Sequence, residues 1–239
     1  MMKKTQKSFV KGAAILAGIG FISKIIGAVY TIASTSIVGT YGMSFYTMTF
    51  PVYTFLLAIS SAGLPVAISK MVSERVAHND YKAAHEVFLK AIKAMFGIGL
   101  ITTIFMIVFS KPIAIMLGSV DASLTIKAIA PSVFFVAIIS AYRGYFQGMQ
   151  QMMPTAVSQI IEQVVKAIAG LLLAWLWIGK GEIYGAAGAV VGITISEVFA
   201  FIYLSILYQR RKADFHSDIM STQYTDLTQH IGRRLIYLA

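Results

Sequence analysis

The sequence predicts an all-α polytopic membrane protein with six transmembrane helices. Of its 239 residues, 57% are hydrophobic and only 13% are charged, and the mean hydropathy is +0.75. This composition lies outside the range of soluble globular domains. The apolar residues also gather in stretches of about 20 or more, the length at which a helix crosses a bilayer. Basic residues are concentrated in the connections between these stretches.

Six stretches are long enough to span the membrane. Because the bilayer core offers the backbone no water, each is expected to be α-helical. The stretches are residues 12–38, 44–69, 90–110, 128–148, 155–178 and 184–208.

Lysine and arginine positions predict the orientation. Of the 20 such residues, Lys24 and Lys166 lie within spans, and only Lys111, Lys127 and Lys180 lie in connections on the side away from the N-terminus. The positive-inside rule therefore predicts a multi-pass protein of the cell membrane with a cytoplasmic N-terminus. The basic N-terminus resembles a secretory signal, but Lys24 interrupts the apolar region and no Ala-x-Ala site follows it. We therefore expect the first span to be retained.

Several function classes are excluded by the composition. The chain has no cysteine, and its four histidines lie in connections without a third ligand, so neither thiolate chemistry nor a metal site is expected. No phosphate-binding loop or hydrolase triad is present, so we predict no enzyme activity and no cofactor. The net charge of +10 does not indicate nucleic acid as a partner, because the basic residues are not interleaved with aromatics on a solvated face.

The first span contains Lys24 near its centre. This lysine is about 12 residues, or roughly 18 Å, from either end of the span, too deep to reach the interface easily. It shares one helix face with Gly20, Gly27 and Thr31. Two interpretations stay open: a lysine paired with a carboxylate for structural reasons, or a cation that lines a cavity.

The second span contains Pro51 and Pro65, so we expect its helix to be kinked or locally unwound, as a static bend or as a hinge. In the following connection, Asn79 and Asp80 form a predicted N-cap. Residues 81–93 then place apolar side chains on one helix face and basic side chains on the opposite face. This pattern is typical of an amphipathic helix on the inner leaflet. The third span is the most lipid-like of the six and is expected to be scaffold.

The fourth and fifth spans contain most of the candidate binding residues. Pro154 favours the start of a helix, and the polar positions that follow it form a stripe through half the membrane. Glu162 precedes Lys166 by four residues, the favourable order for a helical ion pair. That pair is either purely structural or lines an aqueous cavity with Arg143 available to substrate. The polar residues of this region are Arg143, Gln147, Gln159, Glu162, Gln163 and Lys166.

The sixth span combines a ridge of small residues, Gly185, Gly188 and Gly192, with Glu197 near mid-depth. Glu197 could pair with Lys24 or with Lys166. We predict three parts in the chain: a transmembrane lobe over 1–209, a polar cytoplasmic linker over 210–230, and the start of a truncated seventh span over 231–239.

Three segments carry a family resemblance: Ser23–Gly27, Ser61–Pro65 with Ser69–Lys70, and Tyr142–Pro154 continuing to Lys166. Together they resemble the polysaccharide-exporter branch of the multidrug/oligosaccharidyl-lipid/polysaccharide flippase superfamily, with lipid II flippases and stage V sporulation protein B relatives as the closest likeness. The resemblance implies two six-helix lobes around a central cavity, of which this chain is the N-terminal one. The missing C-terminal lobe then becomes an expected partner.

The resemblance also implies a site. Lys24 matches the arginine of a Ser-Arg-x-x-Gly motif on the first span of lipid II flippases, and the second arginine of that span falls at Tyr30. The span-2 arginine of those flippases has no counterpart. Lys24 and Arg143 are expected to hold a pyrophosphate, with Gln147 and Gln159 on sugar or peptide groups.

The function expected from this resemblance is outward flipping of an undecaprenyl-pyrophosphate-linked saccharide, with lipid II as the favoured substrate, by alternating access. Two alternatives stay open: a cation-coupled multidrug antiporter, or a non-transporting scaffold for cell-wall or sporulation assembly.

Overall fold

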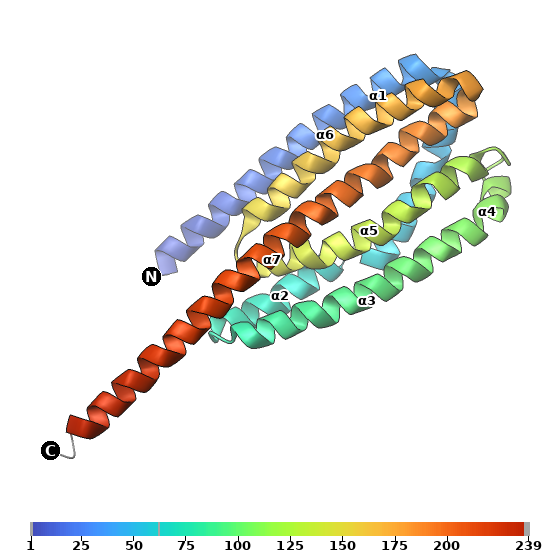
Figure 1. Cartoon of the computed structure of the whole chain (residues 1–239). Helices are drawn as coiled ribbons and strands as arrows, with labels where there is room; N and C mark the ends of the chain where they lie inside the picture. Colours follow the sequence, from blue (N-terminus) through green and yellow to red (C-terminus); the bar gives the residue numbers. More distant parts are fainter. Residues whose placement is uncertain (1, 62, 237–239) are drawn as a thin grey trace. The chain divides into compact units, whose positions relative to one another are not determined.

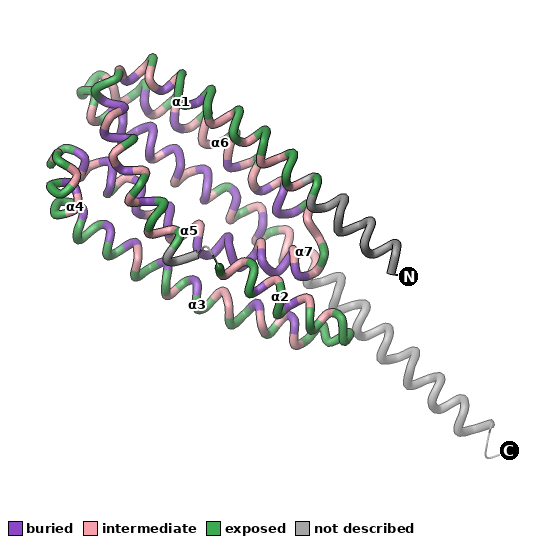
Figure 2. The backbone as a smooth tube through the Cα atoms, turned by 180° about the vertical axis from the view of Figure 1, so that it is seen from behind, coloured by how far each residue is buried: buried purple, intermediate pink, exposed green. Residues whose placement is uncertain are grey.

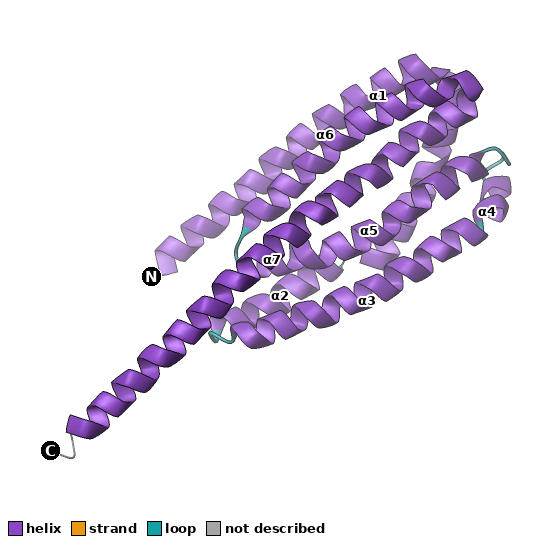
Figure 3. Ribbon diagram, viewed as in Figure 1, coloured by secondary structure: helices purple, strands orange, loops and turns teal. Residues whose placement is uncertain are grey.

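The computed structural model describes the backbone over residues 2–61 and 63–236, and the side chains over residues 14, 16–58 and 63–211. Within these ranges the chain is helical apart from short turns and contains no strand, which confirms the all-α fold class (Figure 3). The chain divides into two units, Met1–Leu204 and Ser205–Ala239. The elements are α1 (Met2–Ser61), α2 (Leu64–Ala77), α3 (Tyr81–Val108), α4 (Ser110–Met116), α5 (Ala122–Gly148), α6 (Met152–Trp177), the 3-10 turn η1 (Ile178–Lys180) and α7 (Glu182–Ile236).

Five helical stretches of the described chain are long and apolar enough to cross a membrane, so the protein is a multi-pass membrane protein. The first of them, Leu16–Ala58, contains 43 residues and measures about 65 Å at 1.5 Å per residue, twice the thickness of a hydrocarbon core. It is bent at Gly39, whose backbone is not helical (φ 82°). The bend lies between the first two predicted spans, while the total of six crossings stays a prediction.

The bend in α1 is held by the start of α7. A φ of +82° is strained for any residue with a Cβ, so Gly39 suits this position. Beyond the bend, the backbone N–H of Gly42 donates a 3.0 Å hydrogen bond to the Glu182 carboxylate. A Cβ on Gly42 would lie 2.8 Å from the Glu182 carbonyl oxygen, so the two backbones meet closely there.

The predicted break in the second span is confirmed. Helix α1 ends at Ser61 and α2 begins at Leu64, with Pro65 in its first turn, where a proline costs no hydrogen bond. The predicted cap of α3 is also confirmed, because the Asp80 carboxylate accepts a 2.9 Å hydrogen bond from the N–H of Ala83.

The prediction that residues 81–93 lie with their apolar stripe in the inner leaflet was wrong. This stretch is the first part of α3, and its stripe packs inside the protein: Phe88 is 1% exposed, and its ring centroid lies 5.1 Å from that of Tyr142 and 4.9 Å from that of Tyr145. The reason is that α5 supplies an aromatic surface, so the stripe is buried against protein rather than lipid.

Helix α5 is the central element of the first unit. It is the most buried of the five membrane-crossing stretches, as the colouring of Figure 2 shows, and it contacts α1, α2, α3, α4 and α6. In Figure 1, α6 runs beside the first part of α1, and the two helices are in contact. Arg143, which α5 carries, is therefore placed against neighbouring helices and is only 17% exposed.

The predicted division at residues 209, 210–230 and 231–239 stays a prediction. Helix α7 is continuous to Ile236, and the proposed linker lies in the second unit. The proposed start of a seventh span continues past residue 236, so its last three residues lie outside the described range.

Candidate functional site

The segment from Tyr142 to Gly148 places glycine and aromatic side chains on the faces of α5 where neighbouring helices pack. A Cβ on Gly144 would lie 2.8 Å from the carbonyl oxygen of Pro65, and one on Gly148 would lie 2.7 Å from that of Ser69. These glycines therefore let α2 approach the α5 backbone, while Tyr142 contacts Phe88 of α3. With these faces occupied by α2 and α3, Arg143 is directed toward α6.

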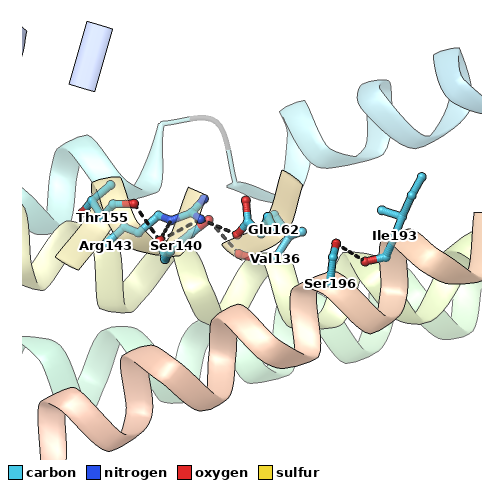
Figure 4. A network of polar contacts seen from close by, with 8 residues as sticks. Val136, Ser140, Arg143, Thr155, Glu162, Ile193 and Ser196 are labelled. Carbon is cyan, nitrogen blue, oxygen red and sulfur yellow. Dashed lines mark hydrogen bonds and ion pairs between the residues drawn. The ribbon is translucent and has the colours of Figure 1, made fainter. Parts of the chain in front are cut away.

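Arg143 connects α5 to α6 through an ion pair and two hydrogen bonds (Figure 4). Its guanidinium forms an ion pair with Glu162. The same group donates to the Ser158 hydroxyl from Nε at 3.1 Å and from Nη2 at 3.0 Å. Ser158 in turn donates to the carbonyl oxygen of Thr155 at 2.8 Å. The side chains of Arg143 and Glu162 are only 17% and 12% exposed, so the pair is shielded from solvent and each charge depends on the other.

The predicted ion pair between Glu162 and Lys166 is not formed. Glu162 bonds to Arg143 instead, and the Lys166 ammonium donates to the side-chain oxygen of Gln163 at 2.7 Å. Arg143 comes from another helix and can present its planar guanidinium to the carboxylate, whereas Lys166 is constrained by its own helix. Arg143 is thus paired within the protein in this structure, and its contact with a substrate stays a prediction.

Lys166 is positioned by α1. Its ammonium lies 5.6 Å from the centre of the Tyr30 ring, within the range of a cation–π contact. The Tyr30 hydroxyl donates a 2.8 Å hydrogen bond to the carbonyl oxygen of Ala189 on α7. The ring that faces Lys166 is thus fixed between three helices, and Lys166 remains partly exposed.

Glu197 of α7 completes the group of charges. Its side chain is buried at 8% exposure, and its charged neighbours are Glu162, Arg143 and Lys166. Among the described side chains no ion pair joins Glu197 to Lys24 or to Lys166, so its pairing with either lysine stays a prediction. Two cations and two carboxylates from three helices form this buried group, which we call the charge cluster: Arg143, Glu162, Lys166 and Glu197.

The remaining candidates lie apart from the charge cluster. Lys24 is exposed on α1, and none of the side chains described in the structure bonds to it. Gln147 and Gln159 are partly exposed, also without a hydrogen-bond partner among the described residues. Sequence reasoning missed Ser158. Its spacing of four residues before Glu162 on the same helix face was the signal that could have found it.

The charge cluster offers charged side chains that can bind an ion or a charged group, but its residues are not those of a hydrolytic or metal centre. Over the described ranges, no group of three His, Asp or Glu side chains is arranged to bind a metal ion. Ionisable side chains buried among membrane helices are costly and are typical of substrate or ion pathways.

The predicted ridge of small residues joins α6 to α7 beside the cluster. A Cβ on Gly192 would lie 2.3 Å from the Cα of Gly170, and one on Gly188 would lie 2.6 Å from the carbonyl oxygen of Leu173. The two backbones are thus in direct contact, which brings Glu197 of α7 close to Glu162 of α6.

Comparison with known proteins places these features in a family context. Residues 9–227 match the family described as polysaccharide biosynthesis protein. Stage V sporulation protein B of Bacillus subtilis (strain 168) is 31% identical over 208 residues, covering 87% of this chain and 40% of that protein. Lipid II flippase MurJ of the same organism is 30% identical over 216 residues, covering 85% of this chain and 40% of that protein. The chain thus spans about two fifths of the length of these relatives.

Solved structures share the fold. A MATE transporter crystallised in complex with MaD3S superimposes with a TM-score of 0.72 at 18% identity, covering 87% of this chain and 46% of that one. The outward-facing conformation of a multidrug resistance MATE family transporter of the MOP superfamily gives a TM-score of 0.67 at 20% identity, with coverage of 87% and 46%. At these identities the likeness concerns the fold alone.

Proposed function

Because the chain belongs to the polysaccharide biosynthesis protein family, we propose that it is the N-terminal lobe of a flippase. Its substrate is an undecaprenyl-pyrophosphate-linked saccharide, with lipid II as the favoured one, moved outward by alternating access. A relative with 30% identity is named lipid II flippase, which supports this substrate class. The function is transport and not an enzymatic reaction.

Exposed Lys24 is the observation that carries the proposal. The charge cluster balances two cations with two carboxylates, so those charges can be explained by packing. Lys24 has no such partner among the described side chains and lies exposed in an apolar span. A lysine facing lipid at this depth would be unfavourable, whereas one facing an aqueous cavity would attract an anion. A pyrophosphate group is an anion suited to such a site.

The other candidate residues have distinct proposed roles. Lys166 is held at the α1 and α6 contact by Tyr30 and adds a second cation for the pyrophosphate. Gln147 and Gln159 are partly exposed and supply amides for sugar or peptide groups. Arg143 can contact the substrate only after it leaves Glu162, so we propose that it joins the site in a different conformation of the transport cycle.

A cation-coupled antiporter of cationic drugs fits less well. Such a protein needs an unpaired carboxylate in the membrane. Within the described part of the chain, Glu162 is bonded to Arg143, and buried Glu197 has Arg143 and Lys166 among its charged neighbours. The proposed partners are therefore the lipid-linked saccharide, the bilayer and a C-terminal lobe, which would close the cavity opposite Lys24.

Complementation tests this function. The complete gene that encodes this chain is expected to restore growth to a Bacillus subtilis cell depleted of its lipid II flippase, and Lys24→Ala is expected to abolish that rescue. This substitution removes the positive charge of Lys24 and breaks no bond to the described side chains. Growth and the accumulation of wall precursor are measured, together with the amount of protein in the membrane.

Lys111→Ala is the matched control, because Lys111 is an exposed lysine on α4, outside the predicted spans. It should rescue like the unmodified gene. Normal growth of Lys24→Ala would remove Lys24 from the site. Failure of the unmodified gene, with protein present in the membrane, would move the proposal to another lipid-linked saccharide or to the scaffold function.

The cytoplasmic N-terminus is tested by cysteine labelling, which the absence of native cysteine makes direct. We expect Val120→Cys, in the turn after α4, to react with a membrane-impermeant maleimide in intact cells. His78→Cys, in the turn between α2 and α3, should react only after the membrane is opened. Both positions are exposed, so accessibility depends on the side of the membrane. The reverse labelling pattern would contradict the positive-inside orientation.

A further inference from the structure

The exposed face of α3 changes from charged to apolar at Lys93. Helix α3 packs its buried face on α2 and α5, and on the opposite face Lys90 and Lys93 are exposed. The exposed large side chains that follow them are apolar: Phe96 is 51% exposed, Ile101 70% and Val108 63%. Such a face fits a membrane boundary, with its charged part among the headgroups and its apolar part in lipid.

The spacing of the lysines agrees with the thickness of a bilayer. No charged residue lies between Lys93 on α3 and Lys111 on α4, and the helical chain between them rises about 27 Å at 1.5 Å per residue. A hydrocarbon core is about 30 Å thick, so these two lysines lie near its opposite surfaces. Lys90 lies one helical turn before Lys93, further toward the solvent.

The positive charge of Lys90 and Lys93 is not balanced within the protein. The two side chains are neighbours, because residues three apart lie on the same face of a helix. No ion pair among the described side chains involves either lysine, although the exposed Glu86 precedes Lys90 by one turn. No acidic residue follows Glu86 until Asp121. Two adjacent cations therefore lie beside the apolar part of α3 without a counter-ion from the described chain.

Phe96 lies one turn beyond Lys93 and is held in place by α5. Its ring centroid lies 5.1 Å from that of Phe134 in an edge-to-face arrangement, while the residue stays 51% exposed. We call Lys90, Lys93 and Phe96 the α3 lipid surface. It combines two cations with a fixed apolar ring, at the depth where a phospholipid has its phosphate and the first part of its acyl chains.

We propose that the α3 lipid surface binds an anionic phospholipid of the surrounding bilayer. The ammonium groups of Lys90 and Lys93 hold the phosphate, and Phe96 contacts the acyl chains. An anionic headgroup fits because the two lysines lack a counter-ion, whereas a zwitterionic headgroup brings its own cation. Each lysine near anionic lipid raises the affinity about fivefold, so the pair raises it about 25-fold. The bound lipid belongs to the bilayer and is not the transported substrate.

Lipid binding by the purified chain in a neutral detergent tests the site. The probes are anionic phosphatidylglycerol and zwitterionic phosphatidylcholine, and the lipid retained by the chain is measured over a titration of each. We expect a preference of about 25-fold for phosphatidylglycerol, and its loss in the double variant Lys90→Ala with Lys93→Ala. The matched control is Arg75→Ala with Lys82→Ala, which removes the same charge from exposed positions further from the apolar part of α3. It should keep the preference.

Equal affinity of the unmodified chain for the two lipids overturns the proposal, and so does an equal loss of preference in both double variants. Should Lys90→Ala with Lys93→Ala fail to fold, Lys90→Gln with Lys93→Gln gives the second test, since glutamine keeps much of the side chain. Preference retained there also overturns the site. If the preference is lost in Lys24→Ala and kept in the double variant, the anionic lipid lies at the proposed substrate site. That result overturns the α3 lipid surface and leaves the proposed function standing.

Discussion

Replacing Arg143 with alanine is expected to lower the free energy of unfolding by about 3–5 kcal/mol, the cost of removing one partner from a buried ion pair. The substitution leaves the Glu162 carboxylate, whose side chain is 12% exposed, without its counter-ion. It also removes two hydrogen bonds to Ser158. The measurement is denaturant unfolding of the purified chain in detergent, followed by the loss of helical signal.

Two controls separate the ion pair from the size of the side chain. Arg75→Ala removes an exposed arginine from α2 and should change stability by less than about 0.5 kcal/mol. The double variant with Arg143→Ala and Glu162→Gln should recover part of the loss, because the uncompensated charge is gone. A single variant Arg143→Ala as stable as the unmodified chain would show that the pair contributes nothing to folding.

The membrane spans were predictable because their signal is local. Span length and hydropathy follow from the thickness of the bilayer, and they place the predicted stretches on the long apolar helices of the structure. The break before Pro65 was equally local, because a proline suits the first turn of a helix. The Asp80 cap follows from the same kind of argument.

The pairing inside the candidate site was not predictable because it depends on how helices are rotated about their axes. Spacing along α6 favoured Glu162 with Lys166, yet the rotation of α5 brings Arg143 to the same carboxylate. The glycines at 144 and 148 set that rotation through α2. Such contacts join residues far apart in the sequence, so a pattern within one helix does not reveal them.

The surroundings of Glu197 were likewise not predictable from the sequence. Its depth and its charge were evident from the sequence, and they restricted its partner to Lys24 or Lys166. The packing of α6 on α7 sets its surroundings, which include Glu162 and Arg143 as well as Lys166.

The contact that sets this packing gives the second large effect. We expect Gly192→Ala to destabilise the chain by about 1–3 kcal/mol, as overpacking does, at the upper end of that range. The added Cβ would lie 2.3 Å from the Cα of Gly170 and 2.4 Å from its nitrogen. Backbone atoms cannot rotate away as a side chain can, so α7 would have to move off α6. The measurement is the same detergent unfolding experiment.

Gly97→Ala is the matched control, since a Cβ at this helical position of α3 would meet nothing within 4 Å. It should be neutral or stabilise the chain by up to about 1 kcal/mol, because alanine is the better helix former. Equal stability of the two variants would mean that the glycine contact does not hold the charge cluster together.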